Sequence, residues 1–410
     1  MNKLKKSKSN KLTFNLPIVA MAVSVISIGL VFGLPSVTDA SGSRSSHRQV
    51  CSDVTGANAS CLVRVVTNRA GAPAVVATPI GLSPTQIHKA YNLPNISTNP
   101  ATIAVVTAYD HPYIKGDLDT YNRTYGLPTF PTCSRTVTKA CFTKVSQSGS
   151  TSRFPAVNAG WALETSLDVE TVHQVCQNCK LVLVEANSNS YNDLMAAVDQ
   201  ARLQGATVIS NSYGSAEFAG EATFDSHFNY PGIAFVFSSG DSGYGATYPA
   251  SSKYVTAVGG TSLYLNADNT RSAEVVWSGA GSGCSTYESK PAFQLDAGCA
   301  TRTVADVSAV ADPNTGAAIY DSVAYLNQRG WFQLGGTSLA APIIAGIYGL
   351  AGNTSTMPAV NAALYSAPAG SLYDVVSGSN GSCPTPYLCT GTIGYDGPTG
   401  IGSPNGIAAF

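Results

Sequence analysis

Charged side chains are scarce in this sequence. Only 11% of the 410 residues are Asp, Glu, Lys or Arg, and the formal net charge is −1, whereas about a quarter of the residues in an average soluble domain are charged. Because the chain has no basic excess, we exclude nucleic acid as a partner. The G-x-S-x-G motif of exported lipases and esterases is also absent. Apolar residues make up 44%, which is enough for a sizeable core.

A long apolar run occurs at the N-terminus. Residues 1–40 contain five lysines, then the apolar run, then a segment that ends with the small residue Ala40. This is the pattern of a secretory signal peptide. The run is long for such a peptide, so a retained membrane anchor stays the alternative. We predict a secreted, extracellular protein with no membrane association once this segment is removed.

The ten cysteines are neighbours in pairs along the chain. This spacing predicts five short-range disulfides, which form in an oxidising compartment and therefore fit export. The Cys176–Cys179 pair could instead be a redox or zinc motif, but no second C-x-x-C completes a zinc site. The pairs are Cys51 and Cys61, Cys133 and Cys141, Cys176 and Cys179, Cys284 and Cys299, and Cys383 and Cys389.

The rest of the chain divides into a short leader and one large domain. Residues 41–78 are rich in Ser, Ala, Gly and Val and are interpreted as an N-terminal leader, a candidate for a reduced propeptide. Residues 79–410 form the predicted main domain. In this domain short apolar runs alternate with helical stretches such as 158–176 and 191–205, which predicts an α/β fold with a parallel sheet. The predicted strands are 102–109, 180–186, 207–213 and 233–240.

The string GGTSL occurs twice, at 259–263 and at 335–339. Strand-like residues flank the first copy on both sides, so Ser262 is expected in extended chain. The second copy leads into an apolar helical run, which places Ser338 at a helix N-terminus. There the backbone N–H groups and the helix dipole favour developing negative charge, as a nucleophile that forms an oxyanion requires. Ser338 is therefore the candidate nucleophile.

A serine nucleophile needs a base, and the usual one is histidine. None of the five histidines lies in an HG turn, although His111 and His173 stay alternatives. Glu164 and Asp168 are better placed, because an i, i+4 spacing puts both carboxyls on one helical face. In a cleft such a pair can share a proton and act as a base. A solvated acidic surface is the competing interpretation.

Asp241 is a third candidate acid. It follows the apolar run 233–240 and lies between Gly240 and Gly243, so it would project from a strand end, where ligand sites form in open α/β sheets. An aspartate that caps a turn is the competing interpretation.

Taken together, these stretches resemble the serine-carboxyl peptidases, or sedolisin family. The motifs are "ALETSLDVE", "SSGDSG", "YPASSKYVTAVGGTSL", "VADVSAVADPNTG", "GGTSLAAP" and "GYDGPTGIGSPNG", in this order. The resemblance runs from about Leu82 to the C-terminus. It implies a subtilisin-like fold: a single catalytic domain with a mainly parallel, seven-stranded sheet flanked by helices. It also implies a prodomain, for which the short leader is the candidate replacement.

The resemblance also implies roles for these residues. Ser338 would be the nucleophile of a serine-type endopeptidase, Glu164 its general base, and Asp168 the partner that orients Glu164. A protonated Asp241 would donate to the oxyanion. Because a carboxyl base titrates well below histidine, and a carboxyl donor fails once it ionises, we expect hydrolysis of protein or peptide substrates in acid.

A calcium site is implied near the C-terminus. Its ligands for one structural ion would be the Asp374 and Asp396 carboxylates and the backbone carbonyls of Val375, Thr392 and Gly394, a set of hard oxygens that suits Ca²⁺. Two aspartates that cap Gly-rich turns are the competing interpretation.

Two other functions stay open. One is a subtilisin-type peptidase with a histidine base. The other is a catalytically silent, calcium-stabilised binding protein on the same scaffold. In each case we expect a monomer.

Overall fold

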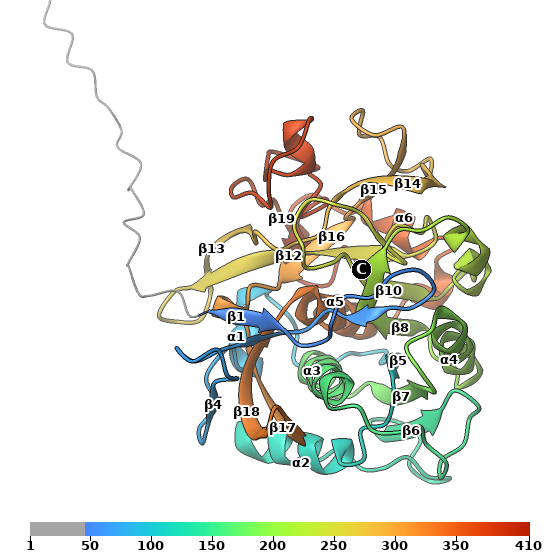
Figure 1. Ribbon diagram of the computed structural model, residues 1–410, viewed down its shortest axis with the longest axis vertical. Coiled ribbons are helices and arrows are strands. Elements are labelled where there is room, and N and C mark those ends of the chain that lie inside the picture. Colours follow the sequence, from blue (N-terminus) through green and yellow to red (C-terminus); the bar gives the residue numbers. More distant parts are fainter. Residues whose placement is uncertain (1–45) are drawn as a thin grey trace, which may run out of the picture. The chain divides into compact units, whose positions relative to one another are not determined.

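An eight-stranded sheet forms the centre of the fold (Figure 1). The computed structural model describes residues 46–410, so the predicted signal peptide at 1–40 lies outside the described residues. The strand order is β13-β12-β10-β8-β5-β7-β6, and β16 pairs with β12. Every pair is parallel except β12–β13. The strands are β5 (Thr102–Ala108), β6 (Phe142–Ser146), β7 (Lys180–Ala186), β8 (Val208–Asn211), β10 (Ala234–Ser238), β12 (Thr256–Leu265), β13 (Arg271–Val276) and β16 (Val307–Val310).

The parallel sheet and four of its strands were predicted correctly. Strands β5, β7, β8 and β10 lie within the four apolar runs identified in the sequence, and their residues are almost all buried. Such strands read as continuous apolar runs because helices cover both faces of a parallel sheet. Ser262 lies in β12, where its hydroxyl donates to Asp312 Oδ2 at 2.7 Å. The prediction that this serine lies in extended chain is confirmed.

Helices pack against this sheet. Helix α5 contacts β5, β8, β10 and β12, helix α4 contacts β5 and β7, and α3 packs against α5. No helix of residues 46–410 is long and apolar enough to cross a membrane. The helices are α1 (Pro84–Ala90), α2 (Ile114–Tyr125), α3 (Ala159–Val175), α4 (Tyr191–Leu203), α5 (Thr337–Ala351) and α6 (Val360–Leu364).

Helix α3 is buried around its whole circumference. The Asn158 side chain caps it by accepting hydrogen bonds from the N–H groups of Gly160 and Trp161. The carboxyls of Glu164 and Asp168 are 0% exposed. The alternative of a solvated acidic surface is therefore wrong, because α5, β17 and β5 cover this helix.

The described part of the predicted leader packs onto the same unit as the domain that follows it. Strands β1, β3 and β4 join β17 and β18 in a second sheet, and β2 joins β9 and β11 in a third. Its role as a propeptide stays a prediction. The strands of these and the two smallest sheets are β1 (His47–Gln49), β2 (Ser60–Cys61), β3 (Arg64–Val66), β4 (Val75–Val76), β9 (Tyr213–Ala216), β11 (Thr247–Tyr248), β14 (Gly283–Ser289), β15 (Thr301–Val304), β17 (Ala317–Tyr325), β18 (Gln328–Gly335), β19 (Leu372–Tyr373) and β20 (Ser403–Pro404).

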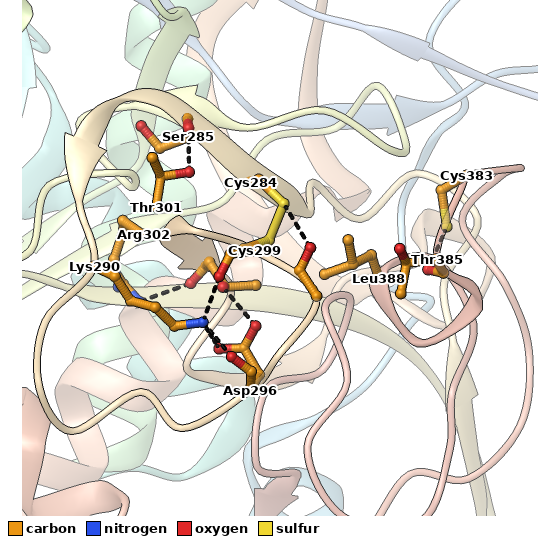
Figure 2. Close-up of a disulfide and its surroundings, with 12 residues drawn as sticks. Cys284, Ser285, Lys290, Asp296, Cys299, Thr301, Arg302, Cys383, Thr385 and Leu388 are labelled. Carbon is orange, nitrogen blue, oxygen red and sulfur yellow. Dashed lines mark hydrogen bonds and ion pairs between the residues drawn. A yellow bond between two sulfur atoms is a disulfide. The ribbon is translucent and has the colours of Figure 1, made fainter.

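All five predicted disulfides are present, and each joins neighbouring cysteines. Cys176 and Cys179 are bonded to each other, as predicted, so neither sulfur is free to bind zinc. Figure 2 shows the Cys284–Cys299 bond between β14 and the start of β15. The loop that it closes is also held by Lys290, which forms an ion pair with Asp296 at 2.9 Å.

Candidate active site

Ser338 lies in the first turn of α5 and is fully buried. The residue before the helix, Gly336, has φ +95°, a value that favours glycine. Four residues after the serine, Pro342 lies inside the helix and has no N–H, so it cannot donate to the Ser338 carbonyl. That carbonyl oxygen instead lies 3.4 Å from the Ser212 hydroxyl oxygen. Local sequence thus sets both the position of the serine and the lack of a helical hydrogen bond to its carbonyl.

The structure brings Ser338 and Glu164 together from positions 174 residues apart. The Ser338 hydroxyl donates to Glu164 Oε2 at 2.9 Å. Its oxygen also lies 3.3 Å from the backbone carbonyl oxygen of Ser212, the residue before β9. The Ser212 hydroxyl donates to Asp168 Oδ1 at 2.6 Å. Ser212, from a third segment, therefore links the nucleophile to the second predicted acid, Asp168.

Burial raises the pKa values of both acids. The pKa of Glu164 lies well above its usual range because the carboxyl is desolvated and the Asp168 charge lies close to it. Desolvation likewise raises the pKa of Asp168, although the bond from Ser212 opposes this. Among the described residues, Oε1 of Glu164 and Oδ2 of Asp168 accept no hydrogen bond. A proton held between two such carboxyls would satisfy one oxygen on each.

Asp241 lies on the other side of Ser338, in the loop after β10. Its Oδ1 accepts hydrogen bonds from the Thr337 N–H at 2.7 Å and from the Thr337 hydroxyl at 2.9 Å. Its Oδ2 has no partner among the described residues. Burial raises the pKa of Asp241 to about 6, while the Thr337 N–H and the charge of Arg64 act in the opposite direction. The carboxyl is therefore protonated in acid and can donate through its free oxygen.

Neither alternative histidine contacts Ser338. His111 is buried, and its Nε2 lies 3.0 Å from the Ser166 hydroxyl and 3.2 Å from Asp321 Oδ1. His173 is also buried, and both its ring nitrogens lack a partner among the described residues. Burial lowers the pKa of His173 to about 3. These positions fit structural histidines better than a general base.

The five predicted calcium ligands lie in two neighbouring segments. Asp396 is 0% exposed, and burial raises its pKa to about 7, with a further contribution from the Asp374 charge. The N–H groups of Thr392 and Gly394 donate to Asp396 and Asp374, each at 2.9 Å. The Val375 carbonyl lies 2.8 Å from the position that a Cβ on Gly391 would occupy. The structure thus brings both carboxylates and these backbone segments together.

Comparison with known proteins identifies the family of this chain. The sequence pattern of the subtilase family matches residues 156–367, which is more than half of the chain. The chain belongs to the subtilase family. The matched region of this subtilase contains Glu164, Asp168, Asp241 and Ser338, and ends before the two predicted calcium-binding aspartates.

Within this family the chain is similar to sedolisins, which confirms the predicted resemblance. It is 36% identical to sedolisin of Pseudomonas sp. (strain 101) over 203 residues, which cover 42% of this chain and 33% of the relative. It is 24% identical to kumamolisin of Bacillus sp. (strain MN-32) over 368 residues, or 81% of this chain and 63% of the relative. The chain thus spans about a third of one relative's length and under two thirds of the other's.

A solved structure of Pseudomonas sedolisin, described as a serine-carboxyl proteinase, matches with a TM-score of 0.65 and 28% identity. The match covers 80% of this chain and 96% of that one. It confirms the predicted subtilisin-like α/β fold.

Two contacts in the site are not predicted from the sequence. The bond from Ser212 to Asp168 depends on the approach of the residue between β8 and β9 to α3. Thr337 belongs to the second GGTSL string, and it holds Asp241. Its position beside the candidate nucleophile was the one available signal.

Proposed function

We propose that this subtilase is a serine-type endopeptidase that hydrolyses protein or peptide substrates in acid, with Ser338, Glu164 and Asp168 as its catalytic triad. The observation that carries the proposal is the 2.9 Å bond from the Ser338 hydroxyl to the buried Glu164 carboxyl. A serine next to a candidate base at the N-terminus of a helix is the arrangement that nucleophilic catalysis requires.

The proton path follows from these contacts. As Ser338 Oγ attacks the peptide carbonyl carbon, its proton passes to Glu164. Glu164 then donates that proton to the leaving amine, and a water molecule hydrolyses the acyl-serine with the same base. Asp168 positions Glu164 and shares the negative charge of the pair, while Ser212 holds Asp168.

Asp241 accounts for an upper pH limit. In its protonated form the free Oδ2 would donate to the oxyanion, together with the Ser338 backbone N–H. Because the pKa of Asp241 is about 6, the carboxyl loses this proton above that pH and can no longer donate. Activity is therefore expected to fall from mildly acidic to neutral pH.

We also propose one structural calcium ion at Asp374 and Asp396. Two carboxylates that approach each other, one of them buried, fit a divalent cation, because its charge would offset their repulsion. The carbonyls of Val375, Thr392 and Gly394 belong to the same proposal. Bound calcium would stabilise the C-terminal loops and would take no part in the reaction.

The proposed site of action is outside the cell, with the enzyme as a monomer. The five disulfides support export, since they persist in oxidising surroundings.

The test is cleavage of an unfolded protein substrate from about pH 3 to about pH 9, with Ser338→Ala as the blank. Glu164→Gln is expected to lower kcat by about 10²-fold or more. Glu170→Gln is the matched control, because Glu170 is a buried carboxyl of the same helix that instead accepts from the Tyr320 N–H at 3.0 Å. An alkaline optimum that survives Glu164→Gln would indicate a histidine base, and absence of cleavage at every pH even when the cleft is open to substrate would favour a binding protein.

A further inference from the structure

The N-terminal segment around Leu62 crosses the candidate active site as an extended strand. Before Leu62, β2 pairs antiparallel with β9, with Ser60 opposite Gly214, and the Ala59 N–H donates to the Asn189 carbonyl at 2.8 Å. After Leu62, β3 pairs antiparallel with β18, with Arg64 opposite Gly335. The strand is thus hydrogen-bonded to the enzyme on both sides of the nucleophile.

Leu62 itself lies at the reacting atoms. Its N–H donates to the Ser212 carbonyl at 3.2 Å, and Ser338 Oγ lies 3.3 Å from that same oxygen. The Leu62 carbonyl oxygen and Asp241 Oδ2 lie 2.1 Å and 2.6 Å from the position that a Cβ on Gly336 would occupy. The Leu62 carbonyl and the free oxygen of Asp241 thus both lie beside the same small space in front of Gly336. This arrangement resembles that expected for the carbonyl of a bound substrate.

A hairpin holds both sides of the Leu62–Val63 bond. Strand β1 pairs antiparallel with β3, and the Val50 N–H donates to the Val63 carbonyl at 3.1 Å. Directly after this contact, Cys51 is bonded to Cys61, the residue before Leu62. The residues before the bond are thus tied, through one disulfide, to a strand that pairs with the residues after it.

We propose that this strand is a built-in substrate mimic that blocks the cleft, and that the Cys51–Cys61 disulfide keeps it there. The inference rests on the proposed peptidase function, and it names the regulation and the substrate preference of that site. The preferred substrate is an extended peptide with leucine on the N-terminal side of the cut bond. Since the strand continues past Ser338 in both directions, the cleft accepts residues on both sides of the bond, as an endopeptidase requires.

Cleavage of the mimic would not release it. Ser338 Oγ bonds to the Leu62 carbonyl carbon, the bond to the Val63 nitrogen breaks, and the serine proton passes through Glu164 to the new amine. Water then releases the Leu62 carboxylic acid and restores the serine hydroxyl. The disulfide and the β1–β3 pairing keep the new amine beside the acyl group. Re-formation of the Leu62–Val63 peptide bond therefore competes with dissociation of the cut strand from the cleft. The short tether gives the mimic a high effective concentration against a free substrate.

The first experiment compares two disulfide variants of the full chain. Cys51→Ser/Cys61→Ser opens the tether, and Cys133→Ser/Cys141→Ser opens a loop of similar size, closed over 8 residues instead of 10, at the β6 edge of the sheet. The probe is an internally quenched peptide with the sequence of residues 58–67 and alanine in place of the cysteine. In acid, we expect kcat/KM to rise at least about tenfold in the first variant and to stay at the wild-type value in the second. Mass spectrometry should find the cut between leucine and valine.

The second experiment tests cleft occupancy without catalysis. Both disulfide variants are made in a Ser338→Ala background, and binding of the same peptide, labelled with a fluorophore, is followed by anisotropy. We expect at least about tenfold tighter binding when the Cys51–Cys61 bond is absent. Leu62→Asp, with all disulfides intact, should also tighten binding, which covers the case in which the cysteine variant fails to fold.

These outcomes separate the two proposals. Tighter binding with no cleavage in any variant supports the blocking strand and contradicts the peptidase function. Cleavage in the wild type at the same rate as in the Cys51→Ser/Cys61→Ser and Leu62→Asp variants overturns the blocking strand and leaves the peptidase function intact. A cut elsewhere in the peptide overturns the register of Leu62.

Discussion

Replacing Asp241 by asparagine changes the charge of the site and leaves its hydrogen bonds possible. The asparagine Oδ1 can still accept from the Thr337 N–H and hydroxyl, as the aspartate oxygen does at 2.7 Å and 2.9 Å. The amide nitrogen would replace Oδ2, which has no partner among the described residues and lies beside the Leu62 carbonyl. The main difference is that asparagine cannot ionise, so its effect on stability must depend on pH.

The pKa of Asp241 sets the size and sign of this effect. Burial raises it from 3.8 to about 6. Between these values the folded state holds a proton that the unfolded state has lost, so the aspartate destabilises the fold increasingly as pH rises. At about 1.4 kcal/mol per pKa unit, the free energy of unfolding loses about 3 kcal/mol by neutral pH. Asp241→Asn should therefore gain about 3 kcal/mol relative to wild type between about pH 3.5 and about pH 7.5.

Urea unfolding measures this difference. Both proteins carry Ser338→Ala, so that neither can digest itself, and the free energy of unfolding is taken at several pH values across that range. Asp312→Asn, which alters the carboxyl that accepts from Ser262 at 2.7 Å in β12, is a control outside the site. A stability difference between Asp241→Asn and its parent that stays constant with pH would show that Asp241 keeps an ordinary pKa, and the proposed donor role would then be wrong.

Three further predictions address other parts of the molecule. Ser212→Ala removes the donor to Asp168 at 2.6 Å, and because a hydrogen bond to a charged group contributes about 1.5–3 kcal/mol, kcat should fall about tenfold or more in steady-state assays while KM changes little. EDTA should lower the Tm of the wild type but not that of Asp396→Asn; equal shifts in both would contradict the calcium site. Arg302→Met leaves the buried Asp306 without the cation that bonds its Oδ1 at 2.7 Å, and should cost about 3–5 kcal/mol in urea unfolding. A loss below about 1 kcal/mol there would contradict the importance of this ion pair.

The fold was predictable because its signals are local. The strands of a parallel sheet are covered on both faces, so β5 and β7 are recognisable as unbroken apolar runs. Ser262 and Ser338 share the same five-residue string, yet the residues after each string already separate a strand from a helix. Disulfide pairing followed from short spacing alone.

Local sequence was enough to predict the strands of the sheet, the helix that begins at the nucleophile, and the i, i+4 pair of acids, since each depends on residues within a few turns of chain. The burial of Glu164 and the bond that Ser338 makes to it could be seen only in the folded chain, because they join residues 174 positions apart. The same holds for the strand through Leu62. Its composition indicated only a short leader. Its place between β9 and β18 depends on backbone hydrogen bonds, which no side-chain pattern in the sequence reveals.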